Sequence, residues 1–225
     1  MLLTAKANEM FKAFKAAGVA RVKVSRRNKK LVPNKRTAFV IFNLPAVVTC
    51  PNATPLCLKY CYARKAETAY PTVLPARIRN YNDSLAADFV PRMVFTILSA
   101  RKYSKADTLL VRIHESGDFY SKEYAEKWME IARQLKGEKV KFIAYTKSFA
   151  FFDGVTLPDN FFLRASVWAD TPASDLEIIA RNGWTIYTAV EKFQTGDAFT
   201  RCRCADCASC GFCWSKRADI RCEIH

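Results

Sequence analysis

The chain has 225 residues, half of them hydrophobic, and a formal net charge of +15. That length allows one large domain with its own core, and the apolar content excludes a disordered chain. No apolar run is long enough to cross a membrane. The first 18 residues contain lysines and lack the apolar core and cleavage site of a secretory signal. We therefore expect a single domain, 1–225, without a membrane partner, in a cytoplasm where thiols stay reduced.

Residues 1–36 form a basic N-terminal segment with eleven Lys or Arg and one acid. Thr4 is placed to cap a helix that ends near Ala17. The stretch RVKVSRRNKK alternates apolar and basic residues, which predicts a two-stranded ribbon with a turn near Arg27-Asn28. Clustered charge of this kind either forms a solvated face or binds phosphates. Residues 1–36 are therefore a candidate contact for nucleic acid.

Strands and helices alternate between residues 37 and 191. Near-continuous apolar stretches predict buried strands that begin at Thr37, Thr108, Val140, Phe161 and Trp184. Helical patterns lie between them, over 75–103 with Pro91 in a first turn, from Ser121 to Gly137, and from Thr171-Pro172 to Asn182-Gly183. This α/β core, 37–191, is expected to be a parallel sheet of about five strands covered on both faces. A partial (β/α) barrel and an open sheet both fit, and both collect their chemistry at the carboxyl ends of the strands.

Three cysteines follow the first predicted strand. Cys50, Cys57 and Cys61 have the spacing C-x6-C-x3-C in a loop rich in proline and polar residues. Three thiolates can hold three irons of a cubane iron–sulfur cluster and leave the fourth iron open to another ligand. A structural zinc ion, the alternative, needs a fourth protein ligand, and the loop contains no histidine or acid to supply it.

Polar residues follow the second and third predicted strands. The stretch HESGDF places His114, Ser116, Gly117 and Asp118 where they can line a small-molecule site, although an ordinary strand-to-helix turn has the same composition. The stretch YTKS adds Tyr145 and Lys147, and a lysine there suits a phosphate or carboxylate. These side chains are the predicted substrate-binding residues.

Residues 192–225 form a cysteine-rich, metal-binding tail. Cys204, Cys207, Cys210 and Cys213 follow the pattern C-x2-C-x2-C-x2-C, with Cys202 and Cys222 on either side. Two-residue spacing resembles the ferredoxin run, whereas structural zinc usually takes two C-x2-C pairs that are farther apart. The predicted metal ligands are Cys202, Cys204, Cys207, Cys210 and Cys213 together with the three loop cysteines. The sequence leaves open one or two 4Fe-4S clusters, or zinc.

The first cysteine loop and the HESGDF turn resemble parts of the radical S-adenosylmethionine enzymes. Those enzymes carry three cysteines after the first strand of a partial barrel, with an aromatic residue before the last one, as Tyr60 precedes Cys61 here. Their usual spacing is C-x3-C-x2-C, from which this sequence departs. They often place a Gly-Gly-Glu turn after the second strand to hold the methionine ammonium. The resemblance implies S-adenosylmethionine as a ligand, with Asp118 supplying a carboxylate to that ammonium.

Four motifs together resemble the phage and plasmid family known as gene product 88. They are CPNATPLCLKYCYA, RIHESGDFYS, YTKS and CASCGFCW, in the family's order from about Phe39 onward. The resemblance implies a small iron–sulfur protein carried by mobile elements, hence in the host cytoplasm, and brings no established reaction. Three functions compete: an iron–sulfur protein with a small-molecule site, a nucleic-acid-binding protein with structural metals, and a sensor with a labile cluster.

Overall fold

The computed structural model describes residues 3–192, 200–202, 206–215 and 218–223. The helices are α1 (Ala5–Ala16), α2 (Pro55–Lys59), α3 (Tyr62–Ala69), α4 (Val73–Leu85), α5 (Phe89–Tyr103), α6 (Lys122–Gln134), α7 (Ala173–Arg181) and α8 (Cys207–Cys210), with the 3-10 turns η1 (Phe149–Phe151) and η2 (Phe212–Trp214). The strands are β1 (Thr37–Phe42), β2 (Thr108–Ile113), β3 (Val140–Thr146), β4 (Phe161–Val167), β5 (Thr185–Val190), β6 (Thr200–Arg201) and β7 (Ile220–Glu223).

These strands form one sheet of seven in the order β1-β2-β3-β4-β5-β7-β6, and every neighbouring pair is parallel. The α/β class and the parallel sheet are confirmed. The expected number of five strands was wrong because the cysteine-rich tail adds β6 and β7. These two strands are short and contain no continuous apolar run from which they could be predicted. Among the described strands, β1 and β6 lie at the two edges and do not pair with each other, so the sheet is open rather than a barrel.

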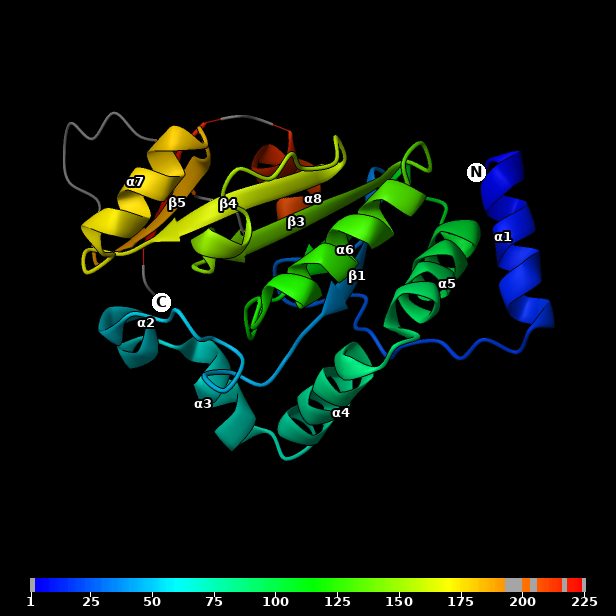
Figure 1. The fold of residues 1–225 in the computed structure, drawn as a ribbon, viewed down its shortest axis with the longest axis horizontal. Helices are drawn as coiled ribbons and strands as arrows, with labels where there is room; N and C mark the ends of the chain where they lie inside the picture. The colour runs from blue at the N-terminus through cyan, green and yellow to red at the C-terminus, as the bar shows by residue number, and fades with distance from the viewer. Residues whose placement is uncertain (1–2, 193–199, 203–205, 216–217, 224–225) are drawn as a thin grey trace.

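The first five strands lie in sequence order, which decides where the helices go. Each connection moves one strand in the same direction, and right-handed crossovers then place α5, α6 and α7 on the same face. Figure 1 shows α5, α6 and α7 on the near side of the sheet and α8 behind it. The helical face buries the larger core, where Trp128 of α6 packs edge to face against Phe42 and Phe89.

The opposite face of the sheet is covered by segments from the two ends of the chain. Phe39 of β1 and Ile143 of β3 pack there against Leu31, Ala208 and Trp214. Both faces are therefore covered, as the apolar strands predicted, but one of them is covered by the cysteine-rich tail. The tail thus contacts the same sheet that carries the first cysteine loop.

The N-terminal helix follows the sequence closely. Thr4 caps α1 by accepting the backbone N–H of Ala7 at 3.2 Å, and Phe11 packs on Phe95 of α5 with ring centroids 5.3 Å apart. The predicted ribbon in RVKVSRRNKK was wrong. Ser25 instead makes an isolated antiparallel bridge with Ile41 of the outer strand β1, because that open edge offers backbone partners.

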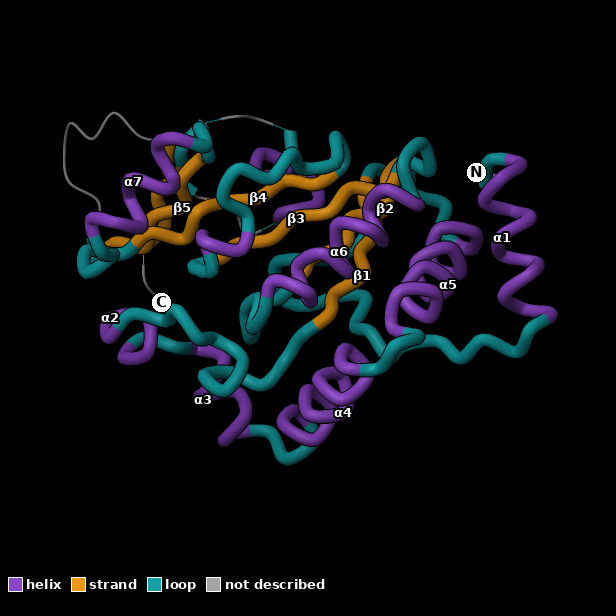
Figure 2. The backbone as a smooth tube through the Cα atoms, viewed as in Figure 1, coloured by secondary structure: helices purple, strands orange, loops and turns teal. Residues whose placement is uncertain are grey.

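The loop after β1 and the helices α2, α3 and α4 lie to one side of the strands, as Figure 2 shows. The predicted helix over 75–103 is divided into α4 and α5, with Pro91 in the first turn of α5 as expected. Among the described residues, no helix combines the length and the apolar character that crossing a membrane requires.

Candidate functional site

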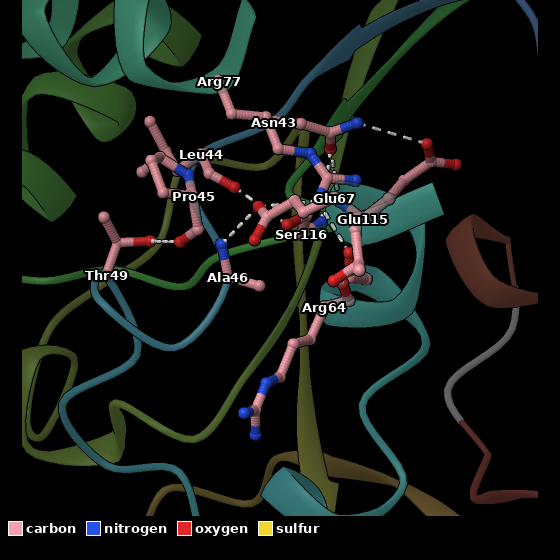
Figure 3. A network of polar contacts seen from close by, with 12 residues as sticks. Asn43, Leu44, Pro45, Ala46, Thr49, Arg64, Glu67, Arg77, Glu115 and Ser116 are labelled. Atoms are coloured by element: carbon pink, nitrogen blue, oxygen red, sulfur yellow. Dashed lines mark hydrogen bonds and ion pairs between the residues drawn. The ribbon is translucent and has the colours of Figure 1, made fainter. Parts of the chain in front are cut away.

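The loop after β1 is fastened to the turn after β2 by hydrogen bonds. Asn43 accepts the backbone N–H groups of Glu115 at 2.7 Å and Ser116 at 3.3 Å through its Oδ1. The Ser116 hydroxyl donates to the carbonyl of Leu44 at 2.8 Å. Figure 3 shows these contacts converging between the two segments. The predicted site residue Ser116 therefore holds the two loops together and is itself buried.

A largely buried ion pair between a residue of α3 and one of α4 also holds the loop after β1 in place. Glu67 accepts the backbone N–H of Ala46 at 2.8 Å and pairs with Arg77, also at 2.8 Å. Arg77 donates as well to the carbonyl of Ala63 at 3.0 Å. Figure 3 places Glu67 between Arg77 and the loop. Because each charge has its partner and a backbone contact, the pair orients the loop that leads into Cys50.

Asp118 joins the ends of β2 and β3. Its Oδ1 accepts the Thr146 hydroxyl at 2.6 Å and the Phe119 N–H at 2.8 Å, and its Oδ2 accepts the Lys147 N–H at 2.8 Å. Burial raises the pKa of Asp118 although these three hydrogen bonds work in the opposite direction. The carboxylate thus sets the position of the segment that carries Lys147.

Lys147 is a buried cation at the carboxyl end of β3, with 6% of its surface exposed. Its ammonium donates to the Ser166 hydroxyl at 2.8 Å and contacts the thiol of Cys57. It lies 5.6 Å from the ring centroid of Trp168, which stacks on Tyr60 at 5.8 Å. Burial lowers the pKa of Lys147, whereas nearby Cys57 raises it. A positive charge therefore faces the cysteine loop at the strand ends.

The three loop cysteines come together at this edge. The thiol of Cys50 interacts with those of Cys57 and Cys61, and all three are half-buried. Burial, followed by the charge of Asp118, raises the pKa of Cys50 to about 12, and burial also raises the pKa of Cys57. Thiols that lie near one another repel once they ionise unless a cation offsets their charge.

The tail cysteines gather on the other face of the sheet. Cys207, Cys210 and Cys213 lie on α8 and η2, and the thiol of Cys207 interacts with those of Cys213, Cys202 and Cys210. Burial and these neighbours raise the pKa of Cys207 to about 11. Cys222 in β7 contacts Cys202, which raises the pKa of the Cys222 thiol. The predicted ligand Cys204 lies outside the described residues.

Two arginines and a tyrosine of the sheet line the tail cysteines. The hydroxyl of Tyr145 contacts the Cys213 thiol, and the guanidinium of Arg112 lies 3.8 Å from the centroid of the Tyr145 ring. Arg164, 2% exposed, donates to the Cys213 carbonyl at 3.1 Å. Tyr145 therefore faces the tail, whereas Lys147 faces the first loop. The predicted substrate role of Tyr145 stays a prediction.

Side chains that converge on a single ion are not found. Among the residues that the structure describes, no group of three or more His, Cys, Asp or Glu is arranged to hold a metal ion. Within each predicted cysteine group the thiols influence one another's pKa, apart from Cys204, which lies outside the described residues. Their role as metal ligands stays a prediction. The structure also contributes residues that sequence reasoning missed, among them Arg112, Arg164 and Glu67. A lone arginine in an apolar strand, as in TLLVRI and FFLRASV, was the available signal for the first two.

His114 lies in the interior rather than at the surface of the site. It is 2% exposed, its Nε2 is 2.8 Å from the Tyr124 hydroxyl, and its ring meets that of Phe119 edge to face. Its backbone has a φ of 61°, a left-handed conformation that turns the chain after β2. The predicted substrate role of His114 stays a prediction.

We expect His114 to make the protein less stable as the pH falls from 7 to 5. Burial, together with the charge of Arg112, lowers the pKa of His114 to about 3, so the folded protein does not take up this proton in that range. The unfolded chain does so below about pH 6.5, which costs up to about 1.4 kcal/mol per pH unit. Urea unfolding of His114→Asn should show a flatter pH profile than the parent, and an unchanged slope would contradict the assignment.

The parallel sheet, with loop thiols and a buried lysine at its strand ends, defines an α/β protein with a candidate site at the carboxyl edge. The chain belongs to the family described as Gene product 88, which matches residues 21–216. The Gene 88 protein of Mycobacterium phage D29 is 33% identical over 106 residues, 44% of this chain and 42% of that protein. The Gene 88 protein of Mycobacterium phage L5 is 33% identical over 105 residues, 44% of this chain and 43% of that protein. These matches span less than half the length of the relatives. No solved structure matches.

Proposed function

We propose that this chain is an iron–sulfur protein that binds a small molecule at the carboxyl edge of its sheet. Cys50, Cys57 and Cys61 would hold a 4Fe-4S cluster with one iron free of cysteine. The observation that carries the proposal is that three half-buried thiols lie near enough to affect one another's pKa, with the buried Lys147 against Cys57. An inorganic cluster offsets the charge of thiolates that otherwise repel one another.

A cluster fits this arrangement better than a single ion does. Each thiolate of a cubane binds a different iron, so the sulfurs surround the cluster and need not converge on one point. A tetrahedral zinc site requires four ligands on one ion, and the first loop offers three cysteines with no histidine or acid. Zinc stays the alternative that metal analysis decides.

The residues around the loop suit a ligand with an anionic group. A cluster with an open iron supplies one-electron reduction and a coordination site for a small molecule, of which S-adenosylmethionine is the proposed example. The Lys147 ammonium would bind a carboxylate or phosphate of that ligand. Gly117 allows the turn after β2 to approach the loop after β1 closely. The oxygens of Asp118 accept three protein donors, one of them the backbone N–H of Lys147, and so position that lysine.

The tail would hold a second cluster through Cys202, Cys207, Cys210 and Cys213, with Cys204 as a further candidate. Arg112 and Arg164 would offset its negative charge from the sheet. In this proposal the protein resembles radical S-adenosylmethionine enzymes in scaffold, is encoded by a phage or plasmid, and works in the host cytoplasm, where thiolates stay reduced. Redox or group-transfer chemistry at the open iron is the proposed use.

The test is anaerobic purification of the full chain followed by iron, sulfide and zinc analysis and an optical spectrum. We expect about four irons and four sulfides for each cluster, with broad visible absorption that bleaches on reduction. Zinc without sulfide would defeat the proposal. The reduced protein is then titrated with S-adenosylmethionine. A changed electron paramagnetic resonance spectrum supports the open iron, and an unchanged spectrum removes this ligand from the proposal.

A further inference from the structure

The segment 21–36 presents an exposed row of positive charge beside the outer strand β1. All eight of its Lys and Arg residues are exposed, and it contains no acid. The bridge between Ser25 and Ile41 and a 2.9 Å hydrogen bond from the Asn34 N–H to the Thr37 carbonyl hold it against β1. The charges therefore lie on an ordered backbone. Ordered charges can recognise a partner at a lower cost in entropy than those of a flexible arm.

Two adjoining cavities lie between this segment and the end of α5. One has a volume of about 410 Å³ and is lined in part by Lys35 and Lys105. The other, of about 250 Å³, is lined in part by Arg21, Arg26 and Tyr103. Both are also lined by Pro33, Ala38 and Ser104, so they form one depression, here called the basic groove. It lies at the amino ends of β1 and β2, opposite the edge that carries the loop cysteines.

The basic groove has positive charge without a compensating acid. No Asp or Glu lines either cavity, and within the described part of the chain Arg21, Arg26, Lys35 and Lys105 form no ion pair. Partial desolvation, with the charge of Arg21, lowers the pKa of Arg26. Two guanidiniums held together without a carboxylate are stabilised when an anion binds between them.

The groove also has an aromatic surface. Tyr103, the last residue of α5, is 75% exposed and lines the smaller cavity. The guanidinium of Arg21, 5.9 Å from the Phe95 ring centroid, is held in the same region. An exposed ring among cations is the combination that single-stranded nucleic acids bind, because unstacked bases lie on aromatic rings while the phosphates pair with Lys and Arg. A duplex keeps its bases stacked inside and cannot use the ring in this way.

We propose that the basic groove binds single-stranded nucleic acid. Arg21, Arg26, Lys35 and Lys105 contact its phosphates, and Tyr103 stacks on one base. This binding does not depend on the proposed cluster, since it uses the opposite end of the sheet.

The experiment measures fluorescence anisotropy of a labelled 12-nucleotide oligo(dT), an oligo(U) of equal length and a DNA duplex with the full chain at several salt concentrations. Arg26→Glu/Lys35→Glu should weaken binding of the single strand about tenfold or more. It should also reduce the salt slope by about 0.7 for each phosphate that the variant no longer neutralises. Tyr103→Ala should weaken binding about tenfold and leave the slope unchanged.

A matched control keeps the same change in total charge. Arg79→Glu/Lys122→Glu reverses two exposed cations on α4 and α6, away from the groove, and should retain the parent affinity within about twofold. Circular dichroism establishes that every variant is folded. The proposal is overturned if the parent does not bind the strand at low salt, if the control loses as much affinity as the groove variant, or if the duplex binds as tightly as the single strand. Comparison of the two strands shows whether the groove prefers DNA or RNA.

Discussion

Replacing Cys50, Cys57 and Cys61 together by serine is expected to remove about four irons and four sulfides per chain and to leave the tail cluster in place. Serine keeps the size of each side chain but is a poor ligand for iron. Because the loop is held at Ala46 by Glu67 and at Asn43 by the turn after β2, the fold should survive the change. Any response of the reduced protein to S-adenosylmethionine should disappear with the loop cluster.

The matched variant replaces Cys207, Cys210 and Cys213, and it should retain both the loop cluster and the response to the small molecule. Cys222→Ser removes a cysteine that contacts Cys202 but belongs to neither proposed ligand set, and it should keep the full metal content. Iron and sulfide analysis with electron paramagnetic resonance distinguishes the cases. If both triple variants lose all iron, the two groups share one cluster, and the assignment of separate sites is wrong.

The sequence predicted most of the α/β core because its elements have strong local signals. Thr4 and Ser121 cap the helices that they were expected to cap, since each side chain accepts a backbone N–H of the first turn. The buried strands showed themselves as continuous apolar runs, as in TAFVIF at β1. Local capping and burial were therefore enough to find the scaffold.

The tail strands could not be found in this way. Thr200–Arg201 and Ile220–Glu223 are short, and they join the sheet because β5 offers an open edge to Ile220. Pairing of this kind depends on partners far away in the sequence. The same limit explains the wrong ribbon near Arg27-Asn28, where Ser25 bridges to Ile41 of β1 instead of pairing within the stretch.

The cysteine motifs located two candidate sites, but the sequence did not indicate which charges would face them. Lys147 was expected at the carboxyl edge and lies beside Cys57 there. Tyr145, only two positions earlier, was assigned to the same pocket but contacts Cys213 on the tail. Tyr145 lies within β3, and its side chain packs on the sheet face that the tail covers. Lys147 follows the end of β3, so its side chain faces the first cysteine loop instead. Pairing of side chains across strands is set by tertiary packing, which composition alone does not report.

Gly117 sits where the two loops of the carboxyl edge come closest. Its φ is +83°, and a Cβ added there would lie 2.6 Å from the Leu44 Cβ and 2.6 Å from the Thr49 Oγ1. Thr49 cannot easily move away, because it is 1% exposed and its hydroxyl donates to the Pro45 carbonyl at 2.7 Å. Only glycine therefore allows the turn after β2 to touch the loop that carries Cys50.

We expect Gly117→Ala to destabilise the fold by about 2–5 kcal/mol and to lower the iron content of anaerobically purified protein. The left-handed backbone costs about 1–2 kcal/mol for alanine, and overpacking adds about 1–3 kcal/mol. Gly137→Ala is the matched control, since its φ is +89° with no atom within 4 Å of the added Cβ, so it carries the backbone cost alone. Urea unfolding measures both variants. Equal losses of stability in the two variants would mean that the close approach of the loops contributes nothing to stability. A full iron content in a destabilised Gly117→Ala would mean that metal binding does not depend on this close approach.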